Sequence, residues 1–235
     1  MRISHAVLQN WTADAIDEWR KTTSNKSDNP EGMVAYSALE ALGQSPYYIM
    51  GFNPRIDNAN EILSSLKVRN TSWSSYTHQC WKCGADVGPR QWCCGPERHQ
   101  KTAIKLIEAL GYDPHQVYAT NAIFLQSADI GKLQDKSKLW EICWEKVHRP
   151  ILEEVKPKWI ICLGNGVGWS SFDLLRRKFN GEIKYCSDEF PHYRHGKWFC
   201  ATEDLSVLGV GHPSRFPLSQ SVLEFIRDRV KEVHD

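Results

Sequence analysis

Two apolar runs constrain the fold of this chain more than any other feature. Residues 159–163 are almost entirely apolar and end at Gly164, and residues 205–210 are similar. Apolar runs of this length without polar alternation predict strands that are buried on both faces. Such strands belong to mostly parallel sheets that helices cover on both sides. The sequence therefore predicts a three-layer α/β/α protein.

Helical segments alternate with further strands along the chain. Strands at 47–51 and 117–121 would complete a central, mostly parallel four-stranded sheet. In such folds, ligands bind outside the carboxyl ends of the strands. Helices are expected at 10–21, 34–42, 101–110, 139–155, 169–179 and 218–233.

Length, composition and charge exclude some classes of protein. With 235 residues, 41% of them hydrophobic, the chain fits one domain, residues 1–235. Nothing resembles a signal peptide, and no apolar run approaches the roughly 20 residues that span a bilayer. We expect a cytoplasmic protein without a membrane partner, and a monomer. The net charge of +1 means that nucleic acid would have to bind local basic clusters, for which the candidates are 176–178, 192–197 and Arg215.

Two short motifs follow predicted strands at distant points of the chain. Gly51-Phe52-Asn53-Pro54 follows the strand at 47–51, and Gly211-His212-Pro213-Ser214 follows the strand at 205–210. Small residues at a strand end let the backbone approach a ligand. The Asn53 amide and the His212 imidazole can then make directed polar contacts. Taken singly, each motif is more typical of an ordinary turn.

These motifs and two segments between them carry a resemblance. With the stretch 109–121, which ends in Val117-Tyr118-Ala119-Thr120-Asn121, and with 156–164, they stand in the order found in the uracil-DNA glycosylase superfamily. The chain resembles a member of this superfamily from Tyr47 to Pro217, apart from residues 56–99. The resemblance implies the three-layer fold, DNA as partner, base flipping and hydrolysis of an N-glycosidic bond.

The chemistry of base release defines two tasks for such an enzyme. The sugar becomes oxocarbenium-like while negative charge collects on the departing pyrimidine, so a positioned water and a hydrogen-bond donor to the base both help. The resemblance implies that His212 is the donor and that Asn53 orients the water. Asp57 could add a carboxylate, although loop aspartates more often form turns. No lysine occupies a motif position, so we expect a monofunctional enzyme with no Schiff base and no cofactor in the chemistry.

Base recognition is expected at the ends of two strands. The resemblance implies that Asn121, Gly51 and Phe52 line the base pocket. An amide offers both a donor and an acceptor, so Asn121 suits uracil or a cytosine derivative.

DNA contacts are expected just after the second motif. The Ser214 hydroxyl and backbone amide suit a phosphate beside the flipped nucleotide. Arg215 or Phe216 could fill the gap that the flipped base leaves, and Arg215 stands where the superfamily carries an apolar wedge.

Residues 68–99 form a cysteine-rich insertion outside the resemblance. Cys80 and Cys83, followed by Cys93 and Cys94, suit structural zinc, with His78 or His99 able to complete the ligand shell. Some superfamily members hold an iron–sulfur cluster, but residues 1–46 contain no cysteine. Cys143 lies near a cluster-ligand position of those relatives, although a buried structural thiol is the commoner role. Zinc is therefore favoured over a cluster.

The insertion follows the first motif directly, so it could form a wall of the base pocket or a platform on DNA. If it reshapes the pocket, the substrate could be bulkier than uracil, such as a modified cytosine of foreign or phage DNA, and both DNA repair and antiviral defence remain open as roles. Two alternatives remain: a DNA-binding module that has lost catalysis, and a hydrolase of nucleotide metabolism. A metal-pinned loop that only stabilises the fold is the simplest role for the insertion itself.

Overall fold

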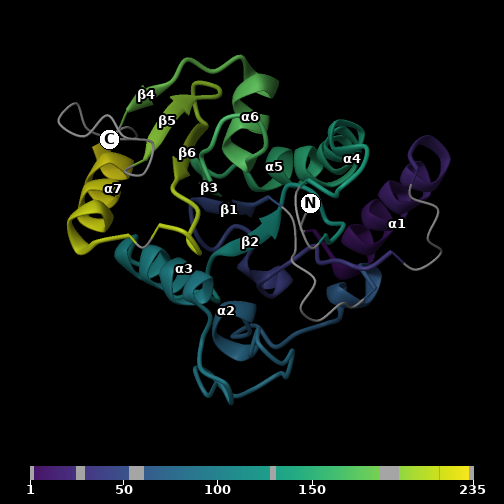
Figure 1. Cartoon of the computed structure of the whole chain (residues 1–235), viewed down its shortest axis with the longest axis horizontal. Coiled ribbons are helices and arrows are strands. Elements are labelled where there is room, and N and C mark those ends of the chain that lie inside the picture. Colours follow the sequence, from purple (N-terminus) through teal and green to yellow (C-terminus); the bar gives the residue numbers. More distant parts are fainter. Residues whose placement is uncertain are drawn as a thin grey trace.

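A six-stranded sheet lies at the centre of the computed structural model, which describes residues 3–24, 30–52, 61–127, 131–185, 196–216 and 218–232. Its strand order is β2-β1-β3-β6-β5-β4 (Figure 1). The first four strands in this order run parallel, and β5 and β4 continue the sheet antiparallel. The strands are β1 (Tyr47–Gly51), β2 (Tyr118–Asn121), β3 (Trp159–Leu163), β4 (Lys184–Tyr185), β5 (Lys197–Cys200) and β6 (Ser206–Val210).

Helices cover both faces of the sheet, which confirms the three-layer α/β class. Successive residues of each central strand point to opposite faces, so Tyr48 and Met50 pack in one apolar core while Ile49 packs in the other. The first core is covered by α1 (His5–Thr22), α4 (Lys136–Cys143), α5 (Arg149–Val155) and α6 (Ser171–Phe179), and the second by α3 (Arg98–Ala109) and α7 (Gln220–Glu232). A π-helical turn, Trp144–His148, joins α4 to α5, and the short helices are η1 (Leu39–Ala41), η3 (Leu63–Leu66) and α2 (Ser75–His78).

The expected four-stranded sheet is wrong in its strand count. The four parallel strands are present, but β5 and β4 extend the sheet beyond β6. The strand β5 was not predicted because it begins with a lysine, Lys197, which is unusual in a buried strand. In the structure this lysine is buried beside the ring of Phe172. The strand is stable because its two aromatic residues pack on opposite faces: Trp198 against Trp159 and Phe199 against Phe172.

The expected helix at 34–42 is also wrong. Only residues 39–41 form a 3₁₀ turn, and residues 34–37 instead pass along the outer edge of β2, where Ala35 forms an isolated antiparallel bridge with Thr120. The Tyr36 N–H donates to the Ala119 carbonyl at 2.8 Å, and the Ala119 N–H donates to the Ser37 hydroxyl at 3.1 Å. Pairing with the otherwise open edge of β2 satisfies the hydrogen-bonding groups of the backbone. The spacing of apolar residues in the sequence carries no information about such pairing.

Within the described part of the chain, none of the helices has the length and apolar character needed to cross a bilayer.

Candidate functional site

The described residues of the two strand-end motifs lie at the same edge of the sheet, after the parallel strands β1 and β6. Gly51 at the end of β1 is in register with Asn121 at the end of β2, and His212 follows β6. Gly164 follows β3, and a Cβ atom built there would lie 3.7 Å from the His212 ring. The chain runs from β1 to β2 on one side of β1, and then to β3 on the other side of β1, so the strand order reverses between β1 and β3. Proteins with α/β folds bind ligands at such a reversal.

The position of His212 fixes its tautomer. Its Nδ1 atom accepts the backbone N–H of Ser214 at 3.3 Å and lies 2.8 Å from the Ser214 hydroxyl. A backbone N–H can only donate, so the proton of the neutral ring resides on Nε2. Burial lowers the pKa of His212, and the nearby Arg215 guanidinium lowers it further. At neutral pH the ring is therefore an uncharged donor through Nε2–H.

The Asn121 amide is held in one orientation. Its Nδ2 atom donates to the Tyr36 hydroxyl at 2.9 Å and to the Met33 carbonyl at 3.5 Å. Because a carbonyl only accepts, these partners assign the NH₂ group to that side. The opposite atom, Oδ1, faces β1, where a Cβ on Gly51 would lie only 2.6 Å away. Both donors of the amide are thus engaged within the protein, and its oxygen is the atom that faces the strand ends.

Of the first motif, Phe52 is buried and its ring lies edge-on to Trp169, with centroids 6.4 Å apart. Arg177 lies over the face of Trp169 at 5.5 Å from the ring centroid. Asn53 and Asp57 fall outside the described residues, so their predicted roles stay predictions.

The turn after His212 presents its next residues outward. The backbone N–H groups of Arg215 and Phe216 both donate to the His212 carbonyl at 2.9 Å. Ser214 and Arg215 are exposed, whereas Phe216 is half-buried. The turn lies against α3, where the Thr102 hydroxyl donates to the Arg98 carbonyl at 2.9 Å and also lies 3.4 Å from the Pro213 carbonyl.

The basic cluster at 176–178 has a structural role. Arg176 and Arg177 each lie 3.3 Å from Asp173, and Lys178 pairs with Glu141 and Glu145. These carboxylates neutralise the cluster, which makes it a poor DNA surface. Of the second cluster, residues 192–195 lie outside the described residues and Lys197 is buried. Arg215, the third candidate, is exposed.

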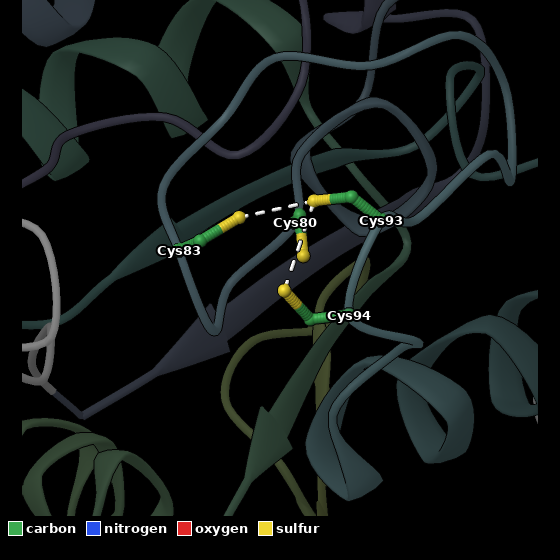
Figure 2. Close-up of side chains that lie close together, drawn as sticks. All are labelled: Cys80, Cys83, Cys93 and Cys94. Atoms are coloured by element: carbon green, nitrogen blue, oxygen red, sulfur yellow. Dashed lines mark hydrogen bonds between the residues drawn. The ribbon is translucent and has the colours of Figure 1, made fainter.

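Four cysteines of the insertion form a candidate metal centre (Figure 2). The sulfur atoms of Cys80, Cys83, Cys93 and Cys94 all lie within 4.8 Å of one another, and those of Cys83 and Cys93 are 3.1 Å apart. Zinc bound to four thiolates at about 2.3 Å holds its sulfurs about 3.8 Å apart in a tetrahedron. The four cysteines therefore fit such an ion, and we call residues 80–95 the knuckle.

Backbone turns bring these thiols together. The Gly84 N–H donates to the Cys80 carbonyl at 2.7 Å, and both Gly84 and Gly95 have positive φ angles, which glycine adopts easily. Burial opposes ionisation of the Cys80 thiol, but hydrogen bonds from the Cys94 backbone and from the other thiols outweigh it and lower its pKa to about 6. A thiolate at this position favours a cation.

Neither of the two histidines considered as further ligands belongs to the four-cysteine group found among the described residues. His78 accepts the Ser74 N–H at 3.3 Å, and the His99 ring packs against Trp81 with centroids 5.3 Å apart. Cys143 is buried in the core below α1 and is not a member of the four-cysteine group. This supports its role as a structural thiol.

Sequence reasoning missed how three aromatic residues complete the site. Tyr36 bonds to Asn121, and its ring packs against Trp81, with centroids 5.6 Å apart. Trp81 packs on His99, and His99 lies edge-on to His212, with centroids 5.3 Å apart and planes at 88°. A continuous line of rings thus joins Asn121 to His212. The run of aromatic residues in the insertion was the one signal in the sequence.

No protein-family model matches this chain, and a search of curated proteins finds no match either.

Proposed function

We propose that this protein is a monofunctional DNA glycosylase that flips a pyrimidine-type base out of DNA and hydrolyses its N-glycosidic bond. The observation that carries the proposal is the His212 ring, held at the strand-order reversal with its donor on Nε2. A preorganised neutral donor stabilises charge that develops on a departing base without needing a proton transfer. The choice of N-glycosidic bond hydrolysis as the reaction rests on the order of the sequence motifs, which resembles that of the uracil-DNA glycosylase superfamily.

In the proposed reaction, water attacks the anomeric carbon as the bond to the base nitrogen breaks, and the base leaves with the bonding electrons. Asn53 orients the water, and the proton that the water loses as the new C–O bond forms passes through solvent to the departing base anion, which ends as the neutral base. His212 donates a hydrogen bond from Nε2–H to the base oxygen that becomes anionic. The product is an abasic site.

The orientation of the Asn121 amide favours one class of base. Uracil presents an oxygen at its 4-position and needs a donor there, whereas cytosine presents an amino group and needs an acceptor. Both Nδ2 hydrogens of Asn121 are directed to Tyr36 and Met33, so the amide offers its oxygen. We therefore propose a cytosine-type base, including the bulky modified cytosines of phage DNA, and a role in defence.

We also propose that the knuckle binds structural zinc. Four cysteine sulfurs within 4.8 Å of one another suit a closed tetrahedral site with no position left for substrate. Elemental analysis of the purified protein by mass spectrometry should find one zinc per chain, and Cys83→Ser with Cys93→Ser should lose it. Iron and sulfide in the wild-type protein would contradict this assignment.

The function is tested by incubating the protein with duplex and single-stranded DNA that carries uracil, cytosine, 5-hydroxymethylcytosine or glucosylated hydroxymethylcytosine. Free base is measured by mass spectrometry. We expect release of a cytosine derivative, and abasic DNA that stays intact and gives no covalent adduct with borohydride.

Variants separate the alternatives. Asn53→Ala and His212→Ala should each lower base release by about a hundredfold or more while DNA binding is kept. Wild-type protein that binds DNA but releases no base indicates a binding module. Release from free nucleosides or nucleotides alone indicates an enzyme of nucleotide metabolism.

A further inference from the structure

The first turn of α3 joins the knuckle to the His212 turn. The buried Gln100 side chain donates to the Gln79 carbonyl at 2.9 Å and to the Ser75 carbonyl at 3.3 Å, which ties α3 to the segment before Cys80. Two residues on, the Thr102 hydroxyl lies 3.4 Å from the Pro213 carbonyl. The same turn of helix therefore contacts both structures, and His99 lies within it.

Ring contacts follow the same path. Trp81 stands between two cysteines of the knuckle, and its indole N–H donates to the Ser75 hydroxyl at 2.8 Å. This bond and the packing of Trp81 against Tyr36 and Tyr76 fix the indole, on which the His99 ring rests. The edge-on contact of His99 with His212 completes the path, and Gly164 lies by the His212 ring at the end of β3.

We propose that His99 is a positioning residue for His212, and that the metal-bound knuckle holds His99 in place through Trp81. The catalytic consequence rests on the function proposed above, whereas the positioning itself does not. This positioning makes the insertion part of the site. Metal bound at the four cysteines would set, through Trp81 and His99, the direction in which the Nε2–H group of His212 points.

Physical reasons support a packing role for His99. The Nδ1 atom of His212 is bonded to Ser214 within the same turn, so this bond leaves the ring free to tilt with the turn, and a neighbouring ring limits that tilt. Misplacing a catalytic group by about 1 Å can cost about a hundredfold in rate. Burial and the neighbouring His212 lower the pKa of His99 to about 3, so His99 stays neutral and acts through its shape.

The first test compares two substitutions at His99. His99→Ala removes the ring, and His99→Phe keeps a ring of similar shape without nitrogen atoms. We expect His99→Ala to lower kcat for base release by about tenfold to a hundredfold with KM nearly unchanged, and His99→Phe to restore it to within about threefold. Equal loss in both variants would overturn positioning by packing. His115→Ala, in the turn before β2, is the control and should match wild type.

The second test asks whether the knuckle acts through His99. Metal is removed with a chelator from wild type and from His99→Ala, with circular dichroism to verify folding. We expect metal removal to lower kcat strongly in wild type. In His99→Ala it should lower kcat by less than about a further twofold, because the packing path from the knuckle to His212 is already broken. A loss of the same factor in both proteins would overturn the coupling. If the metal-free protein unfolds, Trp81→Ala with its metal retained replaces it.

A spectroscopic measurement keeps this inference independent of activity. Nitrogen-15 spectra of the imidazoles report the tautomer and environment of His212 in the absence of DNA. We expect the His212 ring signals to shift on metal removal, in Trp81→Ala and in His99→Ala, but not in His115→Ala. If no DNA base is released while these shifts occur, the proposed function fails and the positioning stands. Unchanged signals in a protein that does release base would overturn the positioning alone.

Discussion

At the scale of single residues, the site depends on the close approach of Gly51 and Asn121. The Asn121 oxygen occupies the space where any larger residue at position 51 would place its Cβ atom. The glycine is thus required by its lack of a side chain, and its backbone needs no unusual φ angle.

Gly51→Ala should therefore displace the Asn121 side chain and lower base release by about tenfold or more, because a contact of 2.6 Å cannot persist. Gly166→Ala is the matched control, since a Cβ there would meet no atom within 4 Å. Both variants are assayed for base release and for thermal unfolding. Wild-type rates in Gly51→Ala would show that the Asn121 amide does not read the base.

The motif order was enough to predict which residues approach the strand ends, since parallel strands share one carboxyl edge. The hydrogen-bond and packing partners of those residues could not be predicted from the sequence. Tyr36 engages the Asn121 amide from a segment whose spacing predicts a helix, and Trp81 reaches His99 across the sequence. Such contacts depend on tertiary packing, which local periodicity does not encode.

At the scale of elements, α3 is the member that organises the insertion. Gln100 takes part in the capping box with Glu97 at the start of α3 and also reaches three carbonyl groups before the knuckle. A buried amide that satisfies several acceptors fixes the relative position of two segments.

Gln100→Ala should lower the free energy of unfolding by about 1–3 kcal/mol, because buried carbonyls lose their donor. It should also expose the knuckle to chelators, measured as faster metal loss. Lys101→Ala, at an exposed position of the same helix, is the control and should change stability by less than about 0.5 kcal/mol. Equal rates of metal loss in the two variants would show that α3 does not support the knuckle.

Most elements of this fold follow from periodicity. The four parallel strands and the helices α3, α6 and α7 agree with the sequence to within three residues, whereas α1 begins at His5, before the predicted start at residue 10. The exceptions, β5 and residues 34–37, are polar or mixed segments whose conformation comes from pairing with a neighbouring strand.

At the scale of the whole molecule, a histidine buried in the core makes stability depend on pH. His148 lies between α4 and α5, where its Nε2–H donates to the Ala122 carbonyl and its Nδ1 accepts the Tyr48 hydroxyl. Burial lowers its pKa to about 4 from an ordinary value of 6.5. The folded state therefore favours the neutral ring, and between these two values the unfolded chain binds more protons.

Stability should fall as pH drops below about 6.5, and the share due to His148 should reach roughly 3 kcal/mol near pH 4. Urea unfolding at pH 7.5 and pH 4.5 measures this loss. In His148→Gln, which keeps an N–H donor but does not titrate, the loss should be smaller by most of that amount. The same loss in wild type and variant would assign the acid sensitivity to other groups.

Residues 34–37, which precede β1 in the sequence, protect one edge of the sheet. They cover the outer edge of β2 and carry Tyr36 to Asn121. A chain shortened to begin at β1 would keep every strand yet present a bare parallel edge, which invites pairing with a second copy and aggregation. The residues before β1 therefore cover the open edge of the sheet and hold the Asn121 amide at the same time, and neither contact can be redesigned without affecting the other.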